Sequence, residues 1–313
     1  LEKVTLGGVD QWILIRAQDT SKPVLLILHG GPGGSQMPWV DLFQPAELEE
    51  NFVVVQWDQR GAGKSFHADL TVDDLQVDDF VADTLELTNM LRDRFGQDKI
   101  FLTRYSWGSA LGFFTLMEDA EPFHTYIATG ERVNWVRSFT ESLAWVKAQA
   151  EAANDTDVLG LIESIQPFDA TNPEHFGLVL QGQEIYRGGD IYTEGLWDRF
   201  LEYALSGQSP YYTEADIGNY VPGLEISGVA LADVVGTYDL FSSFPAATIS
   251  VHFVMGEHDH NTSAGLAREY YEFLDAPAKS FTIVEEAGHS FMYEKPHAWA
   301  AALISIANET LGN

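Results

Sequence analysis

Residues 100–109 read IFLTRYSWGS and combine a strand, a tight turn and the start of a helix. The apolar run Ile100–Leu102 is typical of a buried strand, and helical periodicity follows it through Met117. A serine on such a strand-to-helix turn has its hydroxyl held clear of the sheet. The N–H of the next residue, Trp107, points at the same space from the helix N-terminus. The stretch therefore predicts a nucleophile elbow centred on Ser106.

Short apolar runs elsewhere in the chain predict further strands of the same sheet. Their β-branched and aromatic composition is typical of strands buried on both faces, and they cover Val24–Leu28, Phe52–Val55, Ile249–Met255 and Lys279–Val284. Helical stretches lie between them, such as residues 71–95, which end at Gly96. This alternation predicts an α/β fold with a mostly parallel central sheet and helices on both faces.

The alternation of strand and helix breaks between residues 131 and 240. This segment has helical periodicity and is rich in Trp and Tyr, including Trp135, Trp197 and Tyr220. An aromatic insertion between sheet strands usually lies over the carboxyl edge of the sheet, where ligands bind. We therefore expect residues 131–240 to form an inserted helical cap. Residues 1–130, which open with a hairpin, and residues 241–313 are then the two parts of the core.

Two glycine-rich loops follow predicted strands. The first is HGGPG at residues 29–33, where glycines let the backbone turn sharply and aim an N–H at a developing oxyanion. The second, WDQRGAGKS at residues 57–65, superficially resembles a phosphate loop. It lacks the four residues that separate the first Gly from Gly-Lys-Ser in that motif, so we reject a nucleotide site. We expect Asp58 and Arg60 to hold this loop in place through ion pairs and hydrogen bonds.

Two further strands are followed by groups that could activate a serine. Asp259 comes after the strand at 249–255, and His289 follows the strand at 279–284. The chain order Ser106, Asp259, His289 is that of α/β-hydrolases, and each residue lies just beyond the carboxyl end of a strand. A metal site at His258, Asp259 and His260 is an alternative, because imidazole and carboxylate both bind zinc. A triad already accounts for Asp259, so we expect no metal.

Together these motifs resemble those of the prolyl iminopeptidase group of α/β-hydrolases, which also includes related esterases. The resemblance covers nearly the whole core and is carried by HGGPG at 29–33, DQRG at 58–61 with Gly63 and Ser65, SWGS at 106–109, Asp259, and Gly288-His289. It implies an α/β-hydrolase fold with Ser106 as nucleophile, His289 as base and Asp259 as its orienting acid. It also implies an oxyanion hole formed by the N–H groups of Gly31 and Trp107. Such a triad needs no metal or organic cofactor.

The chain departs from the family pattern in two places. Arg104 stands in the elbow where the family usually has Gly, so its side chain is expected either to distort the turn or to reach across the sheet. Iminopeptidases also hold the substrate amine with lid glutamates, commonly within a Trp-Glu pair, which residues 131–240 lack. Glu184, Glu194 and Glu202 are the candidate amine anchors.

These features leave three functions open. The HGGPG and DQRG motifs and the ordered triad favour a serine hydrolase of iminopeptidase type that releases an N-terminal residue from short peptides. The aromatic cap and the missing Trp-Glu pair favour a carboxylesterase on the same scaffold. Arg104 at the elbow favours a hydrolase fold with weak or no catalysis that acts as a binding protein.

The charge of the chain excludes several classes of partner. Its 313 residues include 17 Lys+Arg, 47 Asp+Glu and no Cys, which gives a formal net charge of −30. A surface this negative repels phosphates and anionic lipids, and no apolar stretch of about 18 residues is present, so nucleic acid and membranes are not expected as partners. The expected partner is a small-molecule or short-peptide substrate, and the oligomeric state is left open. The cytoplasm is the expected location, with export left open because the sequence begins at Leu1.

Overall fold

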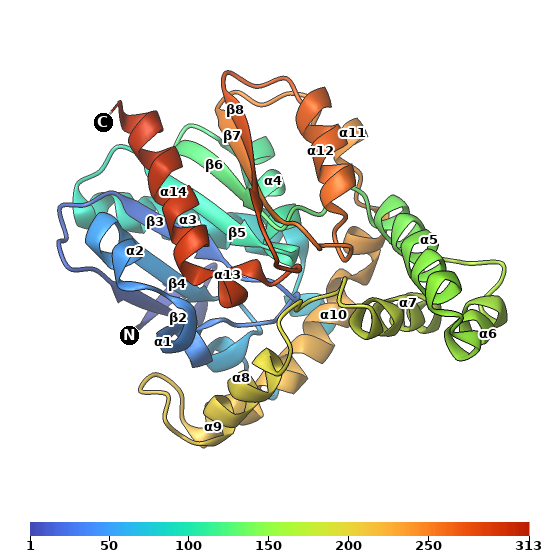
Figure 1. Cartoon of the computed structure of the whole chain (residues 1–313). Coiled ribbons are helices and arrows are strands. Elements are labelled where there is room, and N and C mark those ends of the chain that lie inside the picture. The colour runs from blue at the N-terminus through green and yellow to red at the C-terminus, as the bar shows by residue number, and fades with distance from the viewer. Residues whose placement is uncertain (313) are drawn as a thin grey trace.

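Eight strands pair into one sheet in the computed structural model, which describes residues 1–312 (Figure 1). The strand order is β1-β2-β4-β3-β5-β6-β7-β8. β2 pairs antiparallel with β1 and β4, and all other neighbours are parallel. The strands are β1 (Glu2–Leu6), β2 (Val9–Arg16), β3 (Val24–Leu28), β4 (Val53–Asp58), β5 (Ile100–Tyr105), β6 (Phe123–Thr129), β7 (Ser250–Gly256) and β8 (Lys279–Val284). The predicted mostly parallel sheet is confirmed.

Successive residues of the buried strands face opposite sides of the sheet, and helices cover both sides. In β3, Leu26 and Leu28 pack into one core, whereas Leu25 and Ile27 pack into the other. Residues of α3 (Val77–Phe95), α4 (Trp107–Glu118) and α12 (Ala264–Phe273) complete the first core. Residues of α1 (Val40–Phe43), α2 (Ala46–Asn51), α13 (Phe291–Glu294) and α14 (Pro296–Leu311) complete the second. The fold therefore has the three layers that the sequence predicts.

Strand β6 was not predicted from the sequence, and the predicted strand at Ile100–Leu102 ends earlier than β5 does. β6 reads FHTYIAT, and its polar residues hide the apolar run that would mark a buried strand. Inside the sheet these polar groups are satisfied, since the Thr125 hydroxyl donates to the Ser250 carbonyl oxygen at 2.7 Å. β5 extends past Leu102 because the Thr103 and Arg104 side chains are buried with partners on β6.

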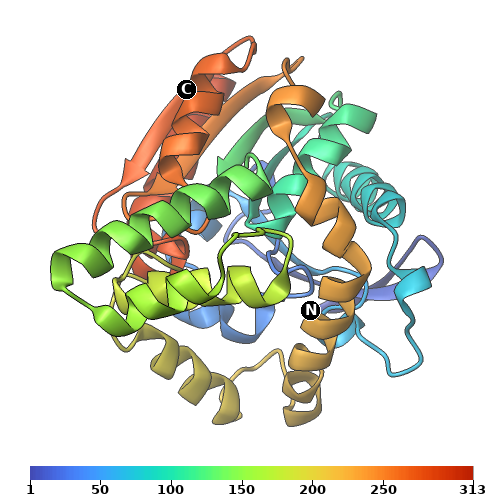
Figure 2. The same ribbon diagram turned by 90° about the vertical axis from the view of Figure 1, so that its right-hand side faces the viewer.

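Seven helices lie between β6 and β7. They are α5 (Trp135–Ala153), α6 (Thr156–Ser164), α7 (Pro173–Ile185), α8 (Leu196–Leu205), α9 (Glu214–Gly218), α10 (Tyr220–Thr237) and α11 (Leu240–Ser243). α5 to α10 lie together beyond the carboxyl ends of the parallel strands, and Figure 2 views the molecule from the side of α5 and α7. Three short 3-10 helices complete the chain: η1 (Met37–Trp39), η2 (Gly63–Ser65) and η3 (Val72–Asp74). The helix predicted over 71–95 is thus divided into η3 and α3.

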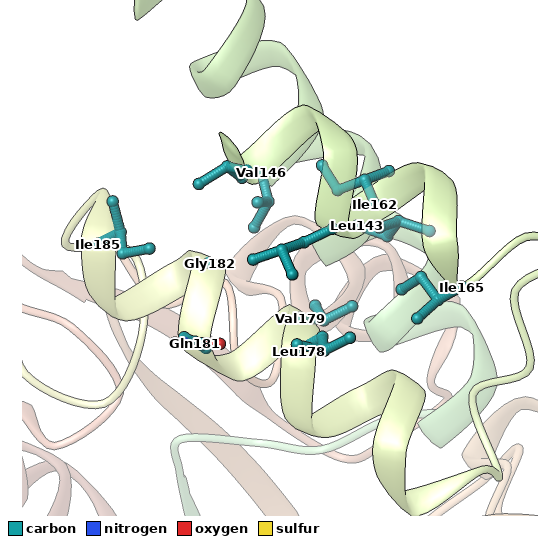
Figure 3. Close-up of a pocket in the computed structure, with 11 residues that line it drawn as sticks. Leu143, Val146, Ile162, Ile165, Leu178, Val179, Gln181, Gly182 and Ile185 are labelled. Carbon is teal, nitrogen blue, oxygen red and sulfur yellow. The ribbon is translucent and has the colours of Figure 1, made fainter. Parts of the chain in front are cut away.

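The inserted helices have apolar cores of their own. α5, α6 and α7 enclose a small pocket lined almost entirely by aliphatic side chains (Figure 3). Leu143 and Val146 of α5 line it together with Ile162 of α6 and Val179 of α7, and it contains no titratable side chain. This pocket therefore belongs to the packing of the helices. Within residues 1–312, no helix is both long and apolar enough to cross a membrane.

Candidate active site

Ser106 lies at the turn between β5 and α4, in a backbone conformation that few side chains adopt. Its φ is 53° and its ψ is −115°. A positive φ is strained for a residue with a Cβ, so the surrounding structure must hold the turn in place. Gly108 permits this packing, because a Cβ at that position would lie 2.5 Å from the Leu28 carbonyl oxygen of β3. The turn places Ser106 on a cavity at the carboxyl end of the sheet.

Arg104 reaches across the sheet and leaves the turn intact. Its buried guanidinium forms an ion pair with Glu131. It also donates from Nε to the Tyr126 hydroxyl at 2.6 Å and from Nη1 to the Thr129 carbonyl oxygen at 2.9 Å. The side chain therefore ties β5 to β6 beneath the elbow, in place of the close strand–helix packing that a glycine would give.

His289 and Asp259 meet beyond the ends of β8 and β7. Nδ1 of His289 lies 2.9 Å from Oδ2 of Asp259, and each residue is only 1% exposed. Thr262 donates to the same carboxylate from its backbone N–H at 2.9 Å and from its hydroxyl at 2.7 Å. Burial opposes ionisation of Asp259, but the charge and hydrogen bond of His289 and the bonds from Thr262 outweigh it and lower the pKa of Asp259. The pair thus favours an ionised carboxylate behind the imidazole.

The second imidazole nitrogen of His289, Nε2, faces the site without a hydrogen-bond partner among residues 1–312. This nitrogen is buried. His289 and Ser106 line the same cavity. Catalytic hydrogen bonds are often long in the absence of substrate and shorten in the reacting complex. The sequence-predicted Ser106, Asp259 and His289 are therefore brought to one place.

Gly31 and Trp107, the residues predicted to form the oxyanion hole, lie beside Ser106. Gly31 has a φ of 109°, and it lies in a tight bend closed by the Gly34 N–H donating to the Gly30 carbonyl oxygen at 3.0 Å. Trp107 is the first residue of α4, whose N-terminus carries partial positive charge. Gly31, Ser106 and Trp107 line one small pocket together. The structure thus brings the predicted oxyanion-hole residues next to the predicted nucleophile.

The loop after β4 is held by buried polar contacts, as the sequence analysis expected. Arg60 pairs with Asp83 of α3 through Nε at 2.7 Å. Asp58 accepts a hydrogen bond from the Lys64 backbone N–H at 2.8 Å and another from the hydroxyl of Tyr212. Burial raises the pKa of Asp58 to about 6, against the effect of these hydrogen bonds. Because Tyr212 lies between α8 and α9, Asp58 also joins the core to the inserted helices.

A cavity of about 810 Å³ extends from Ser106 and His289 towards α7, α8 and α10. Most of its lining is apolar and includes Trp39, Trp197, Phe200, Tyr220, Leu224 and Tyr293. The polar groups are few and include the carboxylates of Glu184 and Asp190. A mostly apolar cavity of this size with a few convergent polar groups is typical of a small-molecule site.

The structure places one of the three predicted amine anchors in this cavity. Glu184 lines it and accepts a hydrogen bond from the Asp190 backbone N–H at 2.8 Å. Burial raises the pKa of Glu184, and the nearby carboxylates of Asp190 and Glu294 raise it further. Glu194 is instead 79% exposed and pairs with Arg187, and Glu202 is exposed on α8. Neither Glu194 nor Glu202 lines the cavity.

Asp190 is a cavity residue that the sequence analysis missed. Its Oδ1 accepts hydrogen bonds from the Ser290 hydroxyl at 2.6 Å and the Tyr105 hydroxyl at 3.0 Å. The backbone around it is joined to the histidine loop, since the His289 N–H donates to the Gly189 carbonyl oxygen at 3.1 Å. Gly288 of the histidine loop allows this close approach, because a Cβ there would lie 2.9 Å from the Gly189 carbonyl oxygen. The Gly188-Gly189 pair before Asp190 was the signal in the sequence.

The histidines that flank Asp259 have other partners. His258 stacks on Tyr192 at a centroid distance of 4.2 Å, and His260 stacks on Trp145 at 4.0 Å. Within residues 1–312, no group of three or more His, Cys, Asp or Glu residues is arranged to hold a metal ion. The geometry at Asp259 is that of a carboxylate facing an imidazole.

Comparisons with known proteins agree with this architecture. The model of the α/β-hydrolase fold family matches residues 23–156. A probable aminopeptidase, YbaC, of Bacillus subtilis is 28% identical over 312 residues, which are 99% of this chain and 97% of that protein. The proline iminopeptidase of Lactobacillus helveticus is 23% identical over 272 residues, which are 79% of this chain and 84% of the relative.

A solved structure gives the same result for the fold. The crystal structure of a proline iminopeptidase from Mycobacterium smegmatis superposes with a TM-score of 0.69 at 19% identity, and the match covers 99% of this chain and 98% of the other. The predicted resemblance is thereby confirmed. The chain has the α/β-hydrolase fold and is similar over nearly its whole length to proteins named as aminopeptidases and proline iminopeptidases.

Proposed function

We propose that this chain is a serine hydrolase of aminopeptidase type, with Ser106 as nucleophile, His289 as general base and Asp259 as the acid that orients it. One observation carries the proposal. Nε2 of the buried His289, which is held through Nδ1 by Asp259, is left without a partner on the cavity that Ser106 lines. Such a nitrogen is poised to accept a proton from a hydroxyl.

The proposed reaction begins when the Ser106 oxygen bonds to the carbonyl carbon and its proton passes to Nε2 of His289. The electron pair of the carbonyl bond moves to the oxygen, and the N–H groups of Gly31 and Trp107 stabilise the resulting oxyanion. When the tetrahedral intermediate collapses, the carbon–nitrogen bond breaks and the proton on Nε2 goes to the leaving amine. Water then repeats the sequence on the acyl-enzyme and releases the acid.

The carboxylates in the cavity support a substrate with a free amine. A substrate ammonium between Glu184 and Asp190 would neutralise carboxylates that lie close together in a partly buried place. Aminopeptidase and proline iminopeptidase are also the names of the relatives. In this proposal residues 131–240 act as the cap that closes the cavity over the core of residues 1–130 and 241–313, and the substrate is a short peptide.

The test compares two chromogenic substrates on purified protein. Proline-p-nitroanilide requires amide cleavage beside a free amine, and p-nitrophenyl butyrate requires only ester cleavage. We expect both to be cleaved by the wild type and neither by Ser106→Ala. Ester cleavage without arylamide cleavage would contradict the aminopeptidase part of the proposal. Ser106→Ala with undiminished activity would contradict all of it.

A carboxylesterase is the second candidate, and the apolar rim of the cavity favours it. Its rim on α8 and α10 presents exposed apolar side chains, with Leu201 and Val221 each 59% exposed. An apolar rim of this kind suits an acyl or alkyl chain. Turnover that rises from p-nitrophenyl acetate to p-nitrophenyl octanoate, in the absence of arylamide cleavage, would favour this candidate.

A further inference from the structure

A second, smaller pocket lies beside Ser106 and shares only two lining residues with the large cavity. Gly31 and Ser106 line both, but the small pocket is otherwise formed by Trp107, Arg132, Trp135 and Tyr238, among others. Its volume of about 20 Å³ is enough for one or two water-sized groups. The oxyanion at Gly31 and Trp107 would take one of these places, which leaves the other for one oxygen of a carboxylate.

Arg132 is a buried cation without an ion-pair partner. It is 9% exposed, and its Nη1 has no hydrogen-bond partner among residues 1–312. Its only side-chain hydrogen bond in that part of the chain runs from Nη2 to Oδ1 of Asn261 at 3.2 Å. The guanidinium is held in place by the ring of Trp135, whose centroid lies 4.6 Å away. The position of the charge is therefore fixed while part of its donor capacity is free.

Arg132 differs from the buried Arg60 and Arg104 of the core, which both have a carboxylate partner. Arg60 pairs with Asp83, and Arg104 pairs with Glu131. Buried charges are nearly always paired, and this chain carries 47 Asp+Glu against 17 Lys+Arg. Nη1 of Arg132 is thus a buried donor that no acceptor of residues 1–312 meets.

The charges around Ser106 are divided between its two sides. Glu184 and Asp190 line the large cavity, whereas Arg132 lines the small pocket. A molecule that binds across Ser106 would meet carboxylates at one end and a guanidinium at the other. A dipeptide has the matching charges, an ammonium at its N-terminus and a carboxylate at its C-terminus, separated by one peptide bond.

We propose that Arg132 binds a substrate carboxylate in the small pocket and that the preferred substrates are dipeptides with a free C-terminus. The assignment of the cleaved bond rests on the proposed function, because it takes Ser106 as the nucleophile. The carboxylate site itself does not, since it follows from the burial and free donors of Arg132. Arg132 is a specificity residue in this proposal, and a guanidinium–carboxylate pair supplies strong, charge-assisted hydrogen bonds.

The first test compares prolyl-alanine with prolyl-alanine amide, which differ only in the carboxylate. We expect wild-type kcat/KM to be about tenfold or more higher for the free acid, since a hydrogen bond to a charged group has at least that effect. The ratio should fall to about 1 in Arg132→Gln and stay above 1 in Arg132→Lys, which keeps the charge. Arg137→Gln removes an exposed arginine of α5 and should leave the ratio unchanged. Because each ratio is taken within one variant, a general loss of activity cancels.

The second test measures binding without turnover. In Ser106→Ala, calorimetry should show that the free acid binds about tenfold more tightly than the amide, and that adding Arg132→Gln removes the difference. Equal affinity of acid and amide for Ser106→Ala would overturn the carboxylate site, whatever the turnover results are. Absence of proline-p-nitroanilide cleavage together with this binding preference would instead overturn the aminopeptidase assignment and leave the carboxylate site standing. The two failures are therefore distinguishable.

Discussion

Replacing Glu131 by Gln should destabilise the fold strongly, because it leaves the Arg104 guanidinium buried without its counter-charge. Both side chains are fully buried in the ion pair. The remaining contacts of Arg104, to the Tyr126 hydroxyl and the Thr129 carbonyl oxygen, use two of its five N–H donors and leave its charge unpaired. Breaking one half of a buried pair costs about 3–5 kcal/mol. For a chain of this size the midpoint of thermal unfolding should fall by about 4–8 °C.

The assay is equilibrium unfolding in urea, followed by tryptophan fluorescence and by circular dichroism. Glu194→Gln is the matched control, because its pair with Arg187 is exposed and an exposed pair contributes about 0–1 kcal/mol. Replacing both buried partners with apolar residues, Arg104→Met with Glu131→Leu, should recover most of the stability. A loss below about 1 kcal/mol in Glu131→Gln would refute the reasoning, since it would mean that the Arg104 charge needs no partner there.

Three further outcomes follow from the site. Asp259→Asn should lower kcat for p-nitrophenyl butyrate by about 10⁴-fold, by analogy with a triad in which the same change gives the wrong imidazole tautomer; a loss below tenfold would argue against the orienting role. Glu184→Gln and Asp190→Asn should each lower kcat/KM for proline-p-nitroanilide by about tenfold to a hundredfold, with little change for the ester and none in Glu194→Gln; equal losses on both substrates would contradict amine binding. Burial raises the pKa of Asp58 to about 6 from 3.8, so between these values the folded state binds a proton that the unfolded state has lost. The stability of wild type relative to Asp58→Asn should therefore fall as pH rises from 4 to 6. Urea unfolding at several pH values measures this difference, and a difference that rises or stays constant would contradict the prediction.

The elements that position the site could be predicted because their signals are local. An apolar run followed by glycines marked the end of β3, and an apolar run followed by Ser106 and helical periodicity marked the elbow. The resemblance then supplied roles for the residues, which remain proposals. β6 was missed because its threonines and His124 interrupt the apolar pattern, and their partners lie on other strands. The order of the strands in the sheet likewise depends on contacts that sequence periodicity does not report.

The cavity residues were predictable only in part, because the inserted helices have no fixed spacing to the catalytic loops. Glu184 and Glu194 lie ten residues apart and looked alike in the sequence, yet only Glu184 faces the cavity. Asp190 is placed by the backbone bonds between its loop and the histidine loop, which are long-range contacts. Arg132 stands out only when its burial and lack of a carboxylate partner among residues 1–312 are known.

Labelling with a fluorophosphonate probe, with the adduct located by mass spectrometry, tests the central claim most directly. The probe reacts with a serine whose hydroxyl is activated by a base, so it reports the nucleophile independently of substrate choice. We predict one adduct, on Ser106, that forms at least about a hundredfold more slowly in His289→Ala because the general base is lost. No adduct on the folded wild type, or an adduct on a different serine, would contradict the account.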